Sequence, residues 1–145
     1  MASAAWREIA WRLAKPAVLL LLLVPFGWLV ADIVLDRLGA NPIEAVLHRT
    51  GDWALRFLLL TLAMTPLRRV TGASWPLRYR RMLGLVAFAY AAVHATTWLL
   101  LDRGLLWDEV VADVLKRPYV TVGFAALVLL VPLAVTSTQG MMRRL

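Results

Sequence analysis

The residue best suited to chemistry in this sequence is His94, which lies within the uncharged apolar stretch 82–101. An imidazole at the depth of a lipid bilayer is costly, so it is a candidate for function. Three roles fit its position: a hydrogen bond to a neighbouring helix, ligation of a haem or a metal ion, or the handling of protons or ions. Gly84, Ala87 and Ala91 lie near it on one helical face. This row of small residues suits either close helix packing or a flat macrocycle, and spacing alone leaves the three roles open.

Arginines near this stretch offer further chemistry. Arg56 lies in a second apolar run, at a depth within roughly 5 Å of His94. Its guanidinium could bind the carboxylates of a haem or extend to the outer lipid headgroups. Arg80 and Arg81 precede the stretch that contains His94. They could hold the phosphate of a flavin or nucleotide, or belong to an ordinary cluster of cytoplasmic positive charge. His48 lies in a polar connection, where we expect it to be solvated or to face a partner.

Composition predicts an all-α membrane protein. Hydrophobic residues make up 61% of the sequence, and the mean hydropathy is +0.72. A soluble fold of this size could not bury so much apolar surface. The apolar runs predict one domain, 1–145, built as a bundle of four transmembrane helices over about 16–35, 53–67, 82–101 and 118–135. The absence of cysteine excludes disulfides, thiolate zinc sites and cysteine-bound iron–sulfur clusters.

The net charge of +7 indicates membrane topology and not nucleic-acid binding, because the basic residues are unevenly distributed. Ten of the sixteen lie in the N-terminal tail, after the second apolar run and at the C-terminus: Arg7, Arg12, Lys15, Arg68, Arg69, Arg78, Arg80, Arg81, Arg143 and Arg144. The positive-inside rule therefore predicts two cytoplasmic termini, with His48 and 102–116 outside. We interpret the first apolar run as a retained anchor and not a cleaved signal peptide. Asn41-Pro42 predicts a turn and a short interfacial helix that ends at Arg49.

Four blocks of sequence closely resemble the MsrQ (formerly YedZ) family, which is related to ferric-reductase-like transmembrane proteins. The blocks are Thr65-Pro66-Leu67-Arg68-Arg69; Arg80-Arg81-Met82-Leu83-Gly84-Leu85 leading to Tyr90 and His94; Lys116-Arg117-Pro118-Tyr119 with Gly123; and Leu133-Ala134-Val135-Thr136-Ser137-Thr138-Gln139. They occur in order from about Pro25 to the C-terminus. Several separate blocks at the right spacing are more specific than shared hydrophobicity.

The resemblance implies a multi-pass b-type cytochrome of the bacterial inner membrane. Such a subunit passes electrons from quinol or a cytoplasmic flavin reductase to MsrP, a periplasmic molybdopterin-containing partner. The reduction of methionine sulfoxide takes place on that partner and not on this subunit. The family's pattern makes His94 a ligand of haem b and implies FMN, which Arg80 and Arg81 would help to hold. The acidic connection 102–113 is then a candidate docking surface for the partner.

The sequence departs from the family's pattern at its C-terminus. Family members continue beyond the block that ends here at Leu145, into further spans with additional histidines. We therefore expect a C-terminally truncated member, in which His94 is the one histidine at membrane depth. The second axial ligand that a b-type haem commonly has would be missing, come from a second protomer, or not be needed. A cofactor-free scaffold or assembly subunit is the alternative function, and a small transporter is a third.

Overall fold

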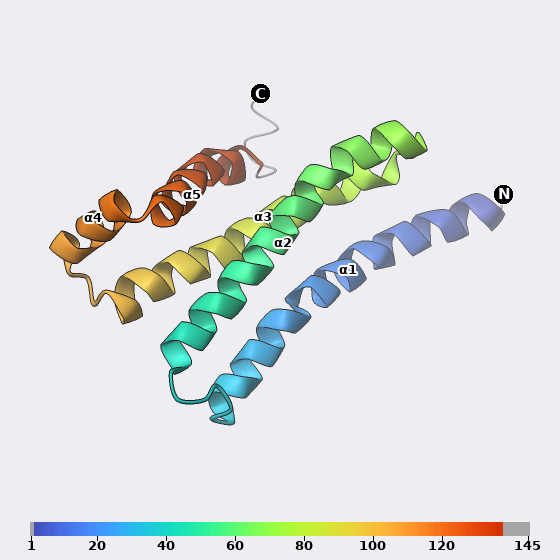
Figure 1. Cartoon of the computed structure of the whole chain (residues 1–145). Coiled ribbons are helices and arrows are strands. Elements are labelled where there is room, and N and C mark those ends of the chain that lie inside the picture. Colours follow the sequence, from blue (N-terminus) through green and yellow to red (C-terminus); the bar gives the residue numbers. More distant parts are fainter. Residues whose placement is uncertain (1, 138–145) are drawn as a thin grey trace. The chain divides into compact units, whose positions relative to one another are not determined.

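The computed structural model describes residues 2–137, and it describes side chains from residue 14 onward (Figure 1). The elements are α1 (Ala2–Val34), α2 (Pro42–Thr71), α3 (Trp75–Thr97), the π-helix η1 (Trp98–Asp102), α4 (Trp107–Lys116) and α5 (Pro118–Thr136). The described residues contain no strand, so the expected all-α class is confirmed. The predicted cytoplasmic charges Arg143 and Arg144, and the end of the last sequence block at Thr138-Gln139, lie outside the described residues.

Three helical segments among the described residues are long and apolar enough to cross a membrane. They are Ala14–Val34, Trp75–Asp102 and Pro118–Thr136, and they correspond to the first, third and fourth predicted spans. Helix α2 contains the predicted span 53–67 but does not belong to this set, because charged side chains such as Asp52, Arg56 and Arg68 interrupt its apolar run. The second crossing and the cytoplasmic termini therefore stay predictions.

The chain divides into two compact units, one ending at Arg37 and the other beginning at Leu38. The first unit is essentially helix α1, which continues without a break through Pro16 and Pro25. The second unit contains α2 to α5 and all of the residues singled out for chemistry.

Helix α2 is longer than the sequence predicts. Asn41 caps its N-terminus, since the Asn41 side chain accepts a hydrogen bond from the backbone N–H of Glu44 at 3.4 Å. At the other end Gly72 adopts a left-handed φ of +67° and its N–H bonds to the carbonyl of Arg68. The predicted interfacial helix ending at Arg49 is wrong, because the helix continues through Thr50 and Gly51. The Thr50 hydroxyl bonds to the carbonyl of Val46 at 2.7 Å within the same helix, so it does not end the helix.

Helices α2 and α3 run antiparallel and form the core of the second unit (Figure 1). Phe57 of α2 and Tyr90 of α3 are buried and meet edge to face, with ring centroids 5.2 Å apart. Gly84 of α3 lies against Thr61 of α2, where an added Cβ would be 3.5 Å from the threonine methyl. The small face predicted around His94 is thus used partly for close helix packing.

The connection 102–116 is structured, which the sequence analysis did not predict. Helix η1 continues α3 to Asp102, and a turn follows in which both Gly104 and Leu105 have positive φ angles, +56° and +60°. Helix α4 then begins with Asp108 and Glu109 in its first turn and ends with Lys116 in its last, an arrangement that suits the helix dipole. Pro118 begins α5 directly afterwards.

We expect Phe57→Ala to destabilise the α2–α3 pair by about 3 kcal/mol, because the packing of a large buried ring against Tyr90 is lost. The free energy of unfolding, measured by titration of the purified protein from mild detergent into sodium dodecyl sulfate, checks this. Leu59→Ala is the matched control, because Leu59 lies on the same helix with its side chain exposed. Equal losses in the two variants would contradict the assignment of Phe57 to the core.

Candidate functional site

His94 faces helix α2 near the end of α3 that leads into η1. Its Nδ1 lies 3.0 Å from the backbone carbonyl oxygen of Leu47 and 3.4 Å from the hydroxyl of Thr50. Gly51 allows this approach, because a Cβ at that position would lie 3.1 Å from both Nδ1 and Cε1 of the ring. Thr50 is fully buried beside it. One turn of α2 therefore positions the ring: the Leu47 carbonyl and the Thr50 hydroxyl contact Nδ1, and glycine at position 51 leaves space for the ring.

The bond to Leu47 determines which ring nitrogen carries the proton. A carbonyl oxygen only accepts hydrogen bonds, so Nδ1 must donate, and in the neutral ring the lone pair then lies on Nε2. Within the part of the chain that the structure describes, Nε2 makes no hydrogen bond. Histidines that bind metals are commonly oriented by such a bond from the second nitrogen. The sequence analysis treated the hydrogen bond and the metal ligand as alternatives, but this geometry allows both.

A cavity of about 570 Å³ opens beside His94 between α2, α3 and α5. Its volume is in the range of cofactor sites. Small residues from all three helices line it, namely Gly51, Ala54, Ala87, Ala91, Ala95, Gly123 and Ala126. Larger apolar side chains complete the wall, among them Leu58, Phe124 and Leu127. Their spacing of three or four residues on each helix gives the cavity one apolar face per helix. The result is a space that is apolar beside His94, whose imidazole forms part of the wall.

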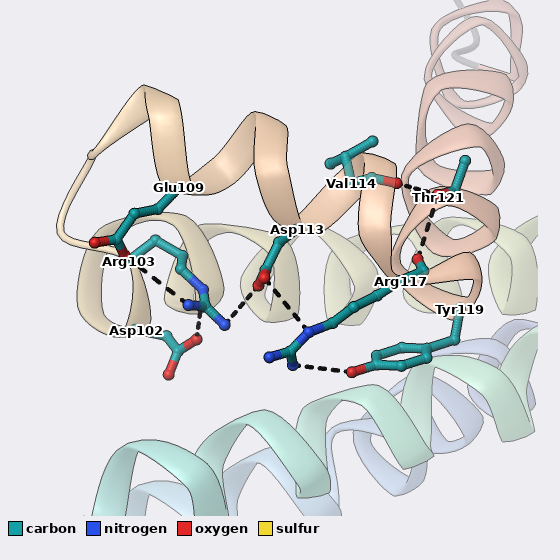
Figure 2. Close-up of polar contacts among 8 residues, drawn as sticks. All are labelled: Asp102, Arg103, Glu109, Asp113, Val114, Arg117, Tyr119 and Thr121. Atoms are coloured by element: carbon teal, nitrogen blue, oxygen red, sulfur yellow. Dashed lines mark hydrogen bonds and ion pairs between the residues drawn. The ribbon is translucent and has the colours of Figure 1, made fainter.

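Polar residues gather at the mouth of this cavity, at the end where η1, α4 and the first turn of α5 meet. Asp113 of α4 bridges two arginines there, with Oδ2 at 2.5 Å from Nη2 of Arg103 and Oδ1 at 3.4 Å from Nε of Arg117 (Figure 2). Arg103 also pairs with Asp102 at 3.2 Å and with Glu109 at 4.0 Å. These contacts join three elements, and we call the five residues the mouth cluster.

The mouth cluster changes the interpretation of 102–113 as an acidic docking surface. The segment contains four acids, Asp102, Asp108, Glu109 and Asp113. Three of them pair with Arg103, and Asp113 pairs with Arg117 as well. The two arginines thus compensate about half of the negative charge that the sequence suggested was available for a partner.

Arg117 is the more accessible arginine of the cluster. Its Nη1 donates a hydrogen bond to the hydroxyl of Tyr119 at 3.0 Å. This bond, together with the nearby Asp113 carboxylate, raises the pKa of Arg117 above its ordinary value. Arg117 and Tyr119 both line the cavity. They give its mouth a permanent positive charge and a phenol, a combination able to bind an anionic group.

The structure does not bring Arg56 to the cavity. Its guanidinium pairs with Asp52 at 3.7 Å, one turn earlier on α2, and lies 4.9 Å from the ring centroid of Trp53. The residue is exposed, and the cavity wall does not include it. This placement favours the alternative in which Arg56 extends toward the lipid headgroups.

Arg80 and Arg81 lie at the end of α3 remote from the cavity mouth. Arg81 Nη2 donates a hydrogen bond to the carbonyl of Ser137, at the C-terminal end of α5. Arg80 is exposed one residue earlier. His48, which was predicted to lie in the connection before the second span, belongs to the continuous helix α2. It lines the cavity mouth with an exposed side chain, 3.7 Å from Glu44.

Sequence reasoning missed the roles of Arg103, Arg117, Tyr119 and Gly51. Arg117 and Tyr119 stood within a recognised block, Lys116-Arg117-Pro118-Tyr119, and were not interpreted as site residues. The role of Gly51 could not be predicted from the sequence, because it depends on contact with the ring of His94, 43 positions later. No group of three or more histidines, cysteines or carboxylates suited to a metal ion occurs among the side chains that the structure describes, in residues 14–137.

We expect Gly51→Ala to displace the His94 ring, because the new Cβ would lie 3.1 Å from two ring atoms. The Nδ1 bond to Leu47 would lengthen, and the protonation preference between the two ring nitrogens would weaken. The 15N chemical shifts of labelled histidine in the purified protein measure this preference directly. Gly84→Ala is the control, since its Cβ meets only ordinary contacts. Unchanged His94 shifts in Gly51→Ala would show that the ring is not held as described.

Comparison with known proteins adds a second line of evidence. Residues 50–145 match the family described as ferric reductase like transmembrane component. The protein-methionine-sulfoxide reductase heme-binding subunit MsrQ of Herminiimonas arsenicoxydans is 53% identical over 133 residues, which is 92% of this chain and 61% of the relative. MsrQ of Ralstonia nicotianae is 56% identical over 134 residues, covering 92% and 62%. MsrQ of Xanthomonas euvesicatoria pv. vesicatoria is 61% identical over 110 residues, covering 76% and 50%.

The chain spans about half to three fifths of the length of these curated relatives. No solved structure matches it. The predicted resemblance to MsrQ is confirmed, and together with the apolar helices it identifies a multi-pass protein of the inner membrane. The chain thus belongs to the ferric-reductase-like transmembrane family.

Proposed function

We propose that this chain is the haem-binding part of a membrane electron-transfer subunit. His94 would hold the iron of a b-type haem in the cavity between α2, α3 and α5. The relatives named as heme-binding subunits support this assignment. The observation that carries it is the bond from Nδ1 of His94 to Leu47, which leaves Nε2 as the lone-pair nitrogen of a neutral ring beside an apolar space.

The residues of the cavity suit this cofactor by chemistry as well as by space. Haem iron, once ligated, takes up and gives up single electrons. Gly51, Ala87, Ala91 and Gly123 leave room for a flat macrocycle, and the surrounding leucines exclude water. A low dielectric around the imidazole and the strength of the Nδ1 bond both influence the reduction potential of such a centre. The chain itself performs no bond chemistry in this proposal.

Arg117 and Tyr119, and not Arg56, are proposed to bind the propionate carboxylates. Both line the mouth of the cavity that contains His94, whereas Arg56 is engaged with Asp52 and Trp53. Nε of Arg117 pairs with the Asp113 carboxylate, and Nη1 donates a hydrogen bond to the Tyr119 hydroxyl. Its remaining donors allow a further charge-assisted hydrogen bond. Arg103 is less suitable, because three carboxylates already surround it.

The electron path proposed for the full-length family members runs from the cytoplasmic side to the periplasm. Quinol or a cytoplasmic flavin reductase donates the electrons, and the periplasmic molybdenum-containing MsrP, which reduces methionine sulfoxide, accepts them. FMN is part of the same proposal. The exposed Arg80 is the better candidate for its phosphate, because Arg81 already bonds to the carbonyl of Ser137 at the end of α5.

His94 is the one residue of this chain proposed to hold the haem iron. Both histidines of the sequence are described, and only His94 lies within the apolar part of the cavity wall. His48 stands at the mouth, exposed and beside Glu44. The competing function is a cofactor-free scaffold, in which the bond to Leu47 merely satisfies a buried imidazole. The two functions differ in whether Nε2 binds iron.

We expect the purified chain to take up added hemin with a Soret band, and His94→Ala to lose that band. His48→Ala is the control and should keep it, because that side chain is exposed at the mouth. Absorption spectra of protein in lipid nanodiscs, recorded with circular dichroism to verify folding, make the measurement. A folded chain that stays colourless, or a band unaffected by His94→Ala, would favour the scaffold.

We expect Arg117→Gln to weaken hemin binding about tenfold, because a charge-assisted hydrogen bond to a carboxylate is lost. Hemin dimethyl ester, which carries no carboxylates, should bind the wild type and Arg117→Gln equally. Titration in nanodiscs gives both affinities. Arg56→Gln is the matched control and should bind hemin like the wild type. If Arg56→Gln weakened hemin binding and Arg117→Gln did not, Arg56 and not Arg117 would be the residue that binds the carboxylates.

A further inference from the structure

Helix α4 has an apolar stripe that no other part of the described chain covers. Trp107, Val111 and Leu115 are spaced four residues apart, so they lie on one face of the helix. Trp107 is 65% exposed, Val111 54% and Leu115 79%. The neighbouring Val110, by contrast, is only 7% exposed and packs inward. An amphipathic helix with a bare apolar face needs an apolar environment outside the protein.

The mouth cluster fixes which way this stripe points. Asp113 lies two residues after Val111, hence about 160° around the helix axis. Its side chain is 13% exposed and pairs with Arg103 and Arg117 on the protein side of α4 (Figure 2). Thr121 of α5 also donates hydrogen bonds to the carbonyls of Val114 and Arg117. These contacts hold α4 by the side that carries Asp113, and the apolar stripe is therefore directed away from the cavity.

The position of α4 along the chain places it at a membrane boundary. It lies between Trp75–Asp102 and Pro118–Thr136, two of the segments able to cross a membrane. The connection on one side is the short turn 103–106, and on the other side Arg117 alone separates α4 from α5. A helix joined so closely to the ends of two spans stays at the level of the lipid headgroups. Leu105 and Leu106, exposed in the preceding turn, extend the apolar surface at that level.

We propose that α4 is an interfacial anchor whose stripe Trp107, Val111 and Leu115 inserts into the lipid of the membrane that α3 and α5 cross. Tryptophan is enriched at this depth, and amphipathic helices bind there with the apolar face inward. Continuity with the two spans favours lipid over a protein partner. The proposal does not depend on haem, and it assigns the bilayer as the occupant of this face.

The chain lends itself to a direct test because it contains no cysteine. Single cysteines at Val111 and Leu115 report on the stripe, and cysteines at their sequence neighbours Ala112 and Lys116 are matched controls about 100° around the helix. None of the four belongs to the mouth cluster. Each variant of the full chain is spin-labelled and reconstituted into vesicles of phosphatidylethanolamine and phosphatidylglycerol. Power-saturation electron paramagnetic resonance then compares collisions with oxygen and with a water-soluble nickel chelate.

We expect severalfold higher ratios of oxygen to nickel accessibility at V111C and L115C than at A112C and K116C. High nickel accessibility at all four positions would show that the stripe faces water and would overturn the proposal. Labels at V111C and L115C that neither reagent reaches would show a protein contact and would overturn it as well. The line shape of each label, which should be that of an ordered helix site, verifies that α4 is formed in that preparation.

Discussion

The site depends on one contact between two helices, the hydrogen bond from Nδ1 of His94 to the carbonyl of Leu47. This bond requires α2 to continue as a helix past Arg49, requires glycine at position 51, and requires α3 to pack closely enough to bring the ring within 3.0 Å. The buried Phe57–Tyr90 pair further along the same two helices maintains that spacing. Stability of the helix pair and orientation of the imidazole are therefore the same structural requirement.

Charge at the cavity mouth is arranged to join elements and not to form a uniform field. Asp113 holds Arg103 and Arg117 together, and Arg103 binds further acids from η1 and α4. Pairs this close to solvent contribute little stability individually, but a network centred on a mostly covered carboxylate restricts its members more strongly. The same network leaves Arg117 with donors to spare, so one residue serves both the fold and the proposed binding of carboxylates.

The sequence predicted the apolar helices, the helical class and the importance of His94, because these follow from hydropathy and from the cost of a polar group in lipid. It did not predict that α2 would be continuous, because Thr50 and Gly51 resemble a helix end until His94 is placed beside them. Arg56 was named as a candidate and Arg117 was not, because depth along a helix can be inferred from spacing, whereas direction around it depends on packing. Helix α4 was missed because its acids suggested a solvated connection, and their arginine partners lie before and after it.

Helix α5 forms one wall of the cavity, yet none of its side chains is buried. Two of its hydrogen bonds to other elements lie near its ends, where Thr121 donates to a carbonyl of α4 and the carbonyl of Ser137 accepts from Arg81. Displacing this wall disturbs few interactions, whereas separating α2 from α3 would break the core. A flat apolar molecule dissolved among the acyl chains could consequently enter the cavity from the lipid side by displacing α5. Helices α2 and α3 would remain packed against each other while it entered.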